Sequence, residues 1–174
     1  MSQKPSSVQP SIGRELRNLG LKILAVLAVF GLVFTFVYGV HRNSDVDMTP
    51  AIKDGDLVMF YRFDKDYAIG DLLLVDFNGH REVRRVVAVA DDVVDITEDG
   101  LMVNGALQQE LEIYQKTHSY ETGIRFPITV GPNQVFVLGD ARENATDSRI
   151  YGPVNINDTY GTVISLVRSR ALSG

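Results

Sequence analysis

An uninterrupted apolar run near the N-terminus constrains this chain more than any other feature. Residues 23–40, ILAVLAVFGLVFTFVYGV, are 18 consecutive uncharged residues. As a helix, such a run is roughly 27 Å long, which is close to the ~30 Å hydrocarbon core of a bilayer. Adding residues 19–21 completes the span, with Lys22 extending its ammonium group to the interface. We therefore expect one transmembrane signal anchor over residues 19–40.

Two other interpretations fit this run less well. The apolar part of a cleaved secretory signal usually covers about 7–15 residues, which is shorter, and Val37-Tyr38-Gly39 is a poor cleavage triplet. A core helix of a soluble protein rarely stays uncharged over such a length. The retained anchor is the favoured interpretation, with the cleaved signal and the core helix as alternatives.

Charge is distributed unevenly along the chain. Residues 1–40 carry Lys4, Arg14, Arg17 and Lys22 against Glu15 alone. Because basic flanks stay on the cytoplasmic side, we expect residues 1–18 to be a cytoplasmic tail and residues 41–174 an extracellular domain of a single-pass cell-membrane protein. Residues 41–174 hold 13 basic and 21 acidic side chains. This acidity argues against nucleic acid as a partner.

Composition also limits the chemistry of the domain. The chain contains no cysteine, which excludes disulfides, thiolate nucleophiles and cysteine-based metal sites. His41, His80 and His118 are far apart in the sequence and lack metal-ligand spacing. We expect neither a metal nor a cofactor.

Beyond the anchor, apolar residues alternate with period two, as is typical of short strands. The predicted strands cover residues 57–63, 72–77, 81–90, 101–103, 134–138 and 160–167. Asn78-Gly79 joins two of them and predicts a type I′ hairpin, and no amphipathic helix is predicted. The fold class is therefore mainly β: one transmembrane helix followed by an all-β, barrel-like or sandwich domain. Residues 91–131, the least regular stretch, are expected to be an insertion.

Four short segments resemble, in order and spacing, the sequence boxes of type I signal peptidases. They are Asp47-Met48-Thr49-Pro50, then Gly55-Asp56, then Val83-Arg84-Arg85-Val86, then Gly139-Asp140 … Asp147-Ser148-Arg149. The family boxes read Ser-Met-x-Pro, Gly-Asp, Val-Lys-Arg-Val and Gly-Asp-Asn … Ser-x-Asp-Ser-Arg. The resemblance covers most of residues 42–168, and it implies a signal-peptidase-like β domain.

The resemblance fails at the residues that carry the family's chemistry. Asp47 stands at the position of the nucleophilic serine, and Arg84 at that of the general-base lysine. A carboxylate has no hydroxyl and a guanidinium stays protonated, so neither can serve in a Ser/Lys mechanism. Ala145 replaces the serine that orients the lysine, and Asp45 places a carboxylate where some members stabilise the oxyanion. These four positions are predicted to be non-catalytic.

Asp47 and Arg84 are expected to form a structural ion pair, because the family fold brings their positions into one cleft. The alternative is that Asp47 lies in a solvated acidic turn without a partner. A water-activating dyad of Asp45 and Asp47 is a third interpretation, but a nearby Arg84 would hold both carboxylates ionised.

Other residues match positions that brace the family fold. These structural residues are Met48, Pro50, Arg85, Asp140, Asp147, Ser148 and Arg149. Arg84 and Arg85 are neighbours on a predicted strand, so their side chains should face opposite sides.

The resemblance is greatest to the SipA-type signal-peptidase homologues of Gram-positive pilus loci, which also lack the Ser/Lys pair. It implies a non-catalytic, chaperone-like role in pilus assembly, with pilin subunits, the pilus sortase or both as partners. A peptide in the remnant groove is a further candidate ligand. The alternative is an active signal peptidase I that cleaves secreted precursors. Ser44 is then the nearest candidate nucleophile, although strand alternation would point it to the other face.

Overall fold

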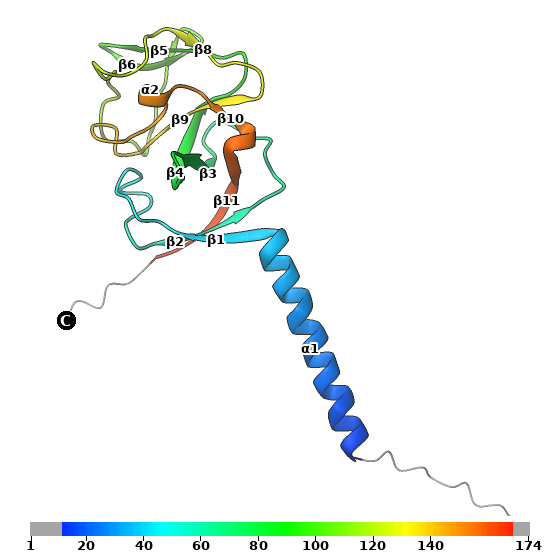
Figure 1. Cartoon of the computed structure of the whole chain (residues 1–174). Helices are drawn as coiled ribbons and strands as arrows, with labels where there is room; N and C mark the ends of the chain where they lie inside the picture. The colour runs from blue at the N-terminus through cyan, green and yellow to red at the C-terminus, as the bar shows by residue number, and fades with distance from the viewer. Residues whose placement is uncertain (1–11, 169–174) are drawn as a thin grey trace, which may run out of the picture. The chain divides into compact units, whose positions relative to one another are not determined.

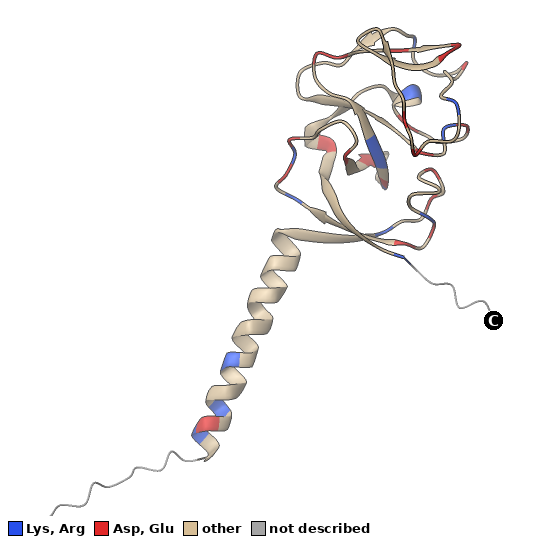
Figure 2. Cartoon of the chain, turned by 180° about the vertical axis from the view of Figure 1, so that it is seen from behind, with Lys and Arg blue, Asp and Glu red and all other residues tan. Residues whose placement is uncertain are grey.

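The computed structural model describes residues 12–168, which form two compact units that divide after Val37. The first unit contains helix α1, Ile12–Phe36 (Figure 1). Its length and composition are sufficient to cross a membrane, and none of its residues is buried. All of its charged residues lie in its N-terminal half (Figure 2).

The bounds of α1 differ from the sequence expectation at both ends. The helix begins at Ile12, so residues 12–18 of the expected tail are helical, while residues 1–11 lie outside the described part of the chain. It ends at Phe36, and the expected continuation to Val40 is wrong because strand β1 begins at Tyr38. Gly39 allows β1 to approach the core, since a Cβ there would lie 2.1 Å from Phe60 Cζ.

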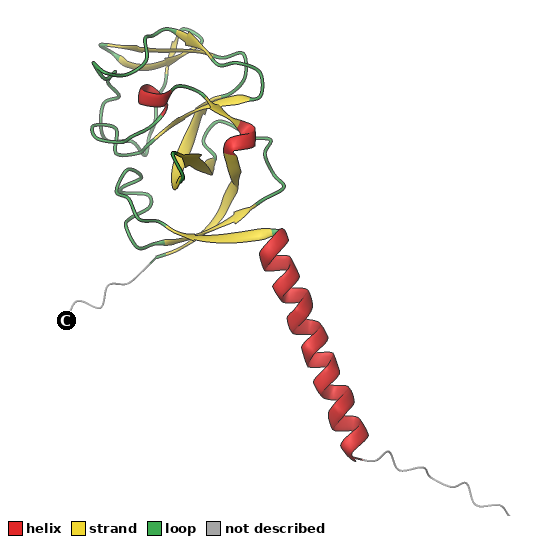
Figure 3. Ribbon diagram, viewed as in Figure 1, coloured by secondary structure: helices red, strands yellow, loops and turns green. Residues whose placement is uncertain are grey.

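The second unit contains two antiparallel sheets (Figures 1 and 3). The larger has the order β1 (Tyr38–Arg42), β2 (Leu57–Tyr61), β11 (Thr159–Val167), β3 (Leu72–Phe77), β4 (His80–Ala88), β9 (Gln134–Leu138), β10 (Val154–Asn155). The smaller has the order β7 (Ala106–Leu107), β6 (Gly100–Val103), β5 (Val93–Thr97), β8 (Ile128–Thr129). The short helix α2 (Ser148–Tyr151) and the 3-10 turn η1 (Ile156–Asp158) complete the unit. The predicted mainly β class is confirmed.

Local predictions agree with the structure where the sequence pattern was strong. The β3–β4 hairpin turns at Asn78 (φ 53°) and Gly79 (φ 80°), with Phe77 paired to His80, as the type I′ prediction requires. Residues 91–131 are more regular than expected, because β5, β6 and β8 form most of the smaller sheet. Within that stretch, residues 108–127 contain no helix or strand.

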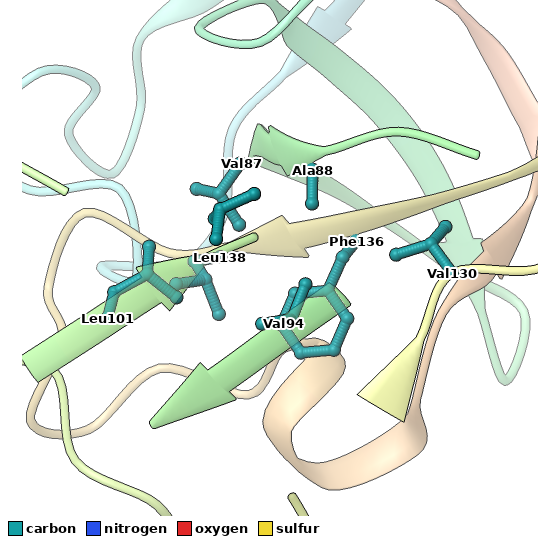
Figure 4. Close-up of a cluster of buried hydrophobic side chains, with 8 residues drawn as sticks. Val87, Ala88, Val94, Leu101, Val130, Phe136 and Leu138 are labelled. Carbon is teal, nitrogen blue, oxygen red and sulfur yellow. The ribbon is translucent and has the colours of Figure 1, made fainter. Parts of the chain in front are cut away.

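The hydrophobic core is divided into clusters, one of which joins the two sheets. One cluster draws on β4 and β9 of the larger sheet and on β5 and β6 of the smaller one, and Figure 4 shows it. Its buried members are Val87, Ala88, Val94, Leu101, Val103, Val130, Phe136 and Leu138. Another cluster contains Met48, Val58, Phe60 and Val83 and fixes the start of β4 against the β1–β2 connection. This second cluster therefore positions the residues on either side of the candidate site.

Candidate functional site: a charged cleft

Arg84, on β4, lies at the centre of the site, and its side chain is 1% exposed. A guanidinium carries five N–H donors, and each of the five in Arg84 has an acceptor. Nε donates to Thr146 O (2.9 Å), Nη1 to Val83 O (2.6 Å) and Asp45 Oδ2 (3.3 Å), and Nη2 to Asp47 Oδ2 (2.7 Å) and Glu82 Oε2 (2.9 Å). The buried cation is therefore fully satisfied by hydrogen bonds.

Asp47 lies in the turn between β1 and β2 and is held by two backbone groups. Thr146 N donates to Asp47 Oδ2 (2.9 Å), and Ala141 N donates to Asp47 O (2.8 Å). The loop comes this close because of Gly139, where a Cβ would lie 2.4 Å from Ala145 Cβ and 2.7 Å from Asp47 O. The expected contact between Asp47 and Arg84 is present, so the solvated-turn interpretation of Asp47 is wrong.

Three carboxylates, those of Asp45, Asp47 and Glu82, share the single guanidinium. Burial raises the pKa of Asp47, opposed by the Thr146 N–H and by Arg84. Burial likewise raises the pKa of Glu82, again opposed by Arg84. Burial alone would lower the pKa of Arg84, but Glu82 and Asp45 outweigh it and raise that pKa. Arg84 therefore stays protonated and cannot act as a base.

Glu82 was not predicted from the sequence, although a signal for it was available. It lies two residues before Arg84 on the same strand, so the two side chains share a face. Asp45 and Asp47 each contact Arg84, and Asp45 Oδ1 accepts from Asp47 N at 3.1 Å. Both carboxylates therefore contact one guanidinium, and an adjacent cation disfavours the shared proton that a dyad needs.

Ala145 is 1% exposed and lies against Gly139. Its carbonyl accepts from Tyr120 Oη at 3.0 Å, and its methyl group offers no hydroxyl to the cleft. The neighbouring Thr146 peptide instead connects the two altered positions, since its N–H binds Asp47 and its C=O binds Arg84.

Arg85 turns away from Arg84, as expected for adjacent residues on a strand. Its Nε and Nη2 donate to the two carboxylate oxygens of Asp140 at 2.8 and 2.7 Å, and its Nη1 donates to Gly70 O at 3.1 Å. Such a bidentate pair fixes both orientation and distance. It fastens β4 to the end of β9, where the loop that holds Asp47 begins.

The predicted structural residues Asp147, Ser148 and Arg149 form buried hydrogen bonds that hold the same loop in place. Arg149 donates to both oxygens of Asp147, at 2.9 and 2.7 Å, and both side chains are 0% exposed. Asp147 Oδ2 also accepts from Gly139 N (3.0 Å), and Ser148 Oγ accepts from Val137 N (3.0 Å). Removing any of these partners would leave a buried polar group unsatisfied.

The remaining two predicted structural residues lie in the β1–β2 connection. Met48 is 0% exposed and belongs to a core cluster. Pro50 is exposed and follows a cis peptide bond. Met48 thus anchors the turn that carries Asp47.

Arg142 is a buried structural residue that the sequence did not reveal. It is 0% exposed, donates through Nε to Gly139 O (2.9 Å) and through Nη1 to Thr117 Oγ1 (2.5 Å), and pairs with Glu110. It ties residues 108–127 to the loop that holds Asp47. The partners lie in the stretch without regular elements, where no periodicity could indicate the contact.

An open cleft of about 620 Å³ adjoins Arg84. It is lined by His41, Ser44, Asp45, Gly79, His80, Arg81, Glu82 and Tyr160. The expectation that Ser44 faces away is wrong, because residues 43–45 are not in a strand and Ser44 lines the same cleft as Asp45. Burial and the nearby Arg81 lower the pKa of His41. Among residues 12–168, no group of three His, Asp or Glu side chains could hold a metal ion.

Comparison of the sequence with known proteins gives matches to one family. The family model "Signal peptidase, peptidase S26" matches residues 16–167. The chain is 27% identical over 140 residues to signal peptidase I P of Bacillus subtilis subsp. natto, covering 73% of this chain and 74% of that protein. It is 28% identical over 171 residues to signal peptidase IB of Staphylococcus aureus, covering 86% and 88%.

A solved structure of signal peptidase I from Enterococcus faecalis is also similar, with a TM-score of 0.47 and 23% identity. The match covers 56% of this chain and 97% of that one. The family match spans most of the described residues, including both β4 and the loop that binds Asp47. The chain therefore belongs to the S26 signal peptidase family.

Proposed function

We propose that this chain is a catalytically inactive member of its family, anchored in the cell membrane by α1, with its β domain outside the cell. One observation carries this proposal. At the two positions that match the family's serine and lysine, Asp47 and Arg84 contact each other at 2.7 Å, and all five N–H donors of Arg84 are engaged.

The surroundings of this pair support an inactive site in two further ways. No hydroxyl is available at Ala145 to orient a base. Asp45 places a carboxylate at the position where some members of the family stabilise the developing oxyanion, and like charge there raises the barrier.

The role we propose is that of a chaperone-like factor in pilus assembly, as in the SipA-type homologues that the sequence resembles. Pilin subunits, the pilus sortase or both are the proposed partners. A peptide segment of such a partner is the proposed ligand of the cleft, whose open, polar lining is suited to an extended polar chain.

Activity is tested with the full chain reconstituted in lipid vesicles and given a precursor that carries a signal peptide. We expect no cleavage, while an active signal peptidase added to the same vesicles cleaves the precursor. Specific cleavage by the wild-type chain that Asp47→Ala abolishes would contradict the proposal and indicate a carboxylate mechanism.

The biological role is tested in a pilus-forming host that lacks its own copy of the gene. Wild type and Ser44→Ala should restore polymerised pili equally, since no nucleophile is needed. If the wild-type chain does not restore pili in this deletion host, the proposed role in assembly is contradicted.

An active signal peptidase is the second candidate, and one observation favours it. Ser44 and His41 line the same cleft, and the buried Nε2 of His41 has no hydrogen-bond partner within residues 12–168. A serine and a neutral imidazole are the components of another hydrolytic pair. Cleavage that is lost in both Ser44→Ala and His41→Ala, but not in Asp47→Ala, would establish this alternative.

A further inference from the structure

A second cavity lies beside Arg85, the residue of β4 whose side chain turns away from Arg84. Its volume is about 230 Å³, and it shares no lining residue with the charged cleft. It is lined by Ile69 and Gly70, by residues 85–87 at the end of β4, by Leu101 of β6 and by residues 108–113. We call this cavity the Arg85 pocket. None of the altered positions 45, 47, 84 and 145 lines it, so it is separate from the site already described.

The Arg85 pocket has an apolar interior and an apolar rim. Val86, Val87 and Leu101 are at most 4% exposed and form its floor. At the rim, Ile69 is 57% exposed and Leu111 is 89% exposed, so both present most of their aliphatic surface to water. Large apolar side chains that gather around a hollow in this way mark an interaction site.

Residues 108–113 form a fixed wall of the pocket, although they contain no helix or strand. Gln108 N donates to Leu101 O at 2.9 Å. The Glu110 carboxylate pairs with the buried Arg142. Because these contacts hold the wall in place, the pocket is already formed without a ligand, and little of the wall has to be ordered on binding.

The volume of the pocket selects the size of its ligand. Sites for whole small molecules usually occupy about 300–1,000 Å³. The Arg85 pocket is smaller, and a cavity of this size holds one large side chain of a bigger partner. Protein interfaces commonly insert an aromatic side chain of one partner into such a hollow of the other.

Charge at the mouth of the pocket selects the neighbours of that aromatic side chain. Arg85 pairs with Asp140, and Glu110 pairs with Arg142, so two of the lining charges are already neutralised. Glu112 is exposed and forms no salt bridge within the described part of the chain. The β domain as a whole is also acidic. An exposed carboxylate beside an apolar hollow, on an acidic domain, favours a cationic residue next to the aromatic one.

We propose that the Arg85 pocket docks a partner protein through one aromatic side chain on an extended segment of that partner, with an adjacent lysine or arginine that pairs with Glu112. This inference goes beyond the proposed function. It requires neither an inactive cleft nor a role in pilus assembly, so either proposal can fail while the other stands.

The absence of cysteine allows a fluorine label to be placed at the pocket. Gln109→Cys in the full chain carries a trifluoromethyl tag, in nanodiscs of uncharged phosphatidylcholine that do not attract cationic peptides. It is titrated with three peptides that have the same glycine-serine ends and the centres Lys-Phe-Lys, Lys-Ala-Lys and Glu-Phe-Glu. We expect a saturable shift of the fluorine resonance with Lys-Phe-Lys and none with Lys-Ala-Lys. Glu-Phe-Glu should bind several-fold more weakly than Lys-Phe-Lys, as is typical of an exposed ion pair.

Substitutions at the rim locate the bound peptide. Ile69→Asn should weaken the binding of Lys-Phe-Lys several-fold, whereas Val93→Asn, at a position that is 40% exposed and outside the pocket, should not change it. Glu112→Lys should reverse the preference, so that Glu-Phe-Glu binds more tightly than Lys-Phe-Lys, and the exposed Glu121→Lys should keep the original order. Thermal unfolding checks that each variant is folded, and the comparison of the three peptides does not depend on these variants.

Several results would overturn the proposal. No saturable shift with Lys-Phe-Lys, or equal binding of Lys-Ala-Lys, would show that the pocket takes no aromatic side chain. Equal effects of Ile69→Asn and Val93→Asn would place the peptide elsewhere. An unchanged order of the peptides in Glu112→Lys would remove the selection by charge. A fluorine shift that depends on the concentration of the chain, with no peptide present, would show that a second copy of the chain fills the pocket.

Discussion

Arg84 donates through Nη2 to Asp47 Oδ2 at 2.7 Å, while its side chain is 1% exposed and that of Asp47 is 16% exposed. The pair joins β4 to the β1–β2 connection, which are 37 residues apart in the sequence. The two positions that match the family's serine and lysine thus form a cross-link within the fold, and its contribution to stability can be measured.

Removing Arg84 should destabilise the domain more than removing Asp47. Arg84→Ala leaves three carboxylates close together, with an expected cost of about 3–5 kcal/mol. Asp47→Ala leaves Arg84 with Asp45 and Glu82, so we expect about 1–2 kcal/mol from the unpaired Thr146 N–H and the lost pair. Denaturant unfolding of both single variants and the double variant should give a coupling of about 1–2 kcal/mol, and additive effects would show that the contact contributes nothing.

Acidification should stabilise the domain through Glu82. Because the folded-state pKa of Glu82 is raised, the folded protein takes up its proton at a higher pH than the unfolded chain. The stabilisation that comes from protonating Glu82 is complete below the ordinary glutamate pKa of 4.5. It is lost as the pH rises through the pKa of Glu82 in the folded protein. Asp47 contributes in the same direction.

Glu82→Gln should therefore increase the free energy of unfolding at pH 7. It should also reduce the difference in that free energy between pH 7 and pH 4.5. The measurement is denaturant unfolding at a series of pH values, with the exposed Glu121→Gln as the control. An unchanged pH dependence in Glu82→Gln would show that Arg84 already cancels the effect of burial.

Restoring the two family residues should not restore cleavage. In Asp47→Ser with Arg84→Lys, the new lysine lacks an orienting hydroxyl at Ala145 and lies beside Asp45 and Glu82. These carboxylates favour its protonated form and so raise its pKa. We expect no robust turnover of a signal-peptide substrate unless Ala145→Ser and neutral residues at 45 and 82 are added. Robust turnover by the double variant alone would show that the surrounding residues matter little.

Gly139→Ala should destabilise the domain although no polar contact is removed. The new methyl group would meet Ala145 Cβ and Asp47 O, so we expect a cost of about 1–3 kcal/mol. Adding Ala145→Gly removes the first clash and leaves the second, so the double variant should recover part of the loss. If Gly139→Ala has the same unfolding midpoint as wild type, the loop moves to accommodate the methyl group at no cost in stability.

The sequence by itself determined the mainly β class, the β3–β4 hairpin and the functional groups present at positions 47, 84 and 145. These follow from local information: alternation of side chains, turn residues with positive φ, and the functional groups that each residue carries. It also indicated that Arg84 and Arg85 would face opposite sides, since strand geometry alone separates adjacent residues.

Only the tertiary structure decided where the anchor helix ends, because residues 38–40 are apolar enough to continue it and become part of a strand through pairing with β2. It also decided that Asp45 and the Thr146 peptide contact Arg84, and that Arg142 ties residues 108–127 to the loop that holds Asp47. These contacts join segments that are distant along the chain. Their geometry depends on how the sheets pack, and no short-range pattern in the sequence records it.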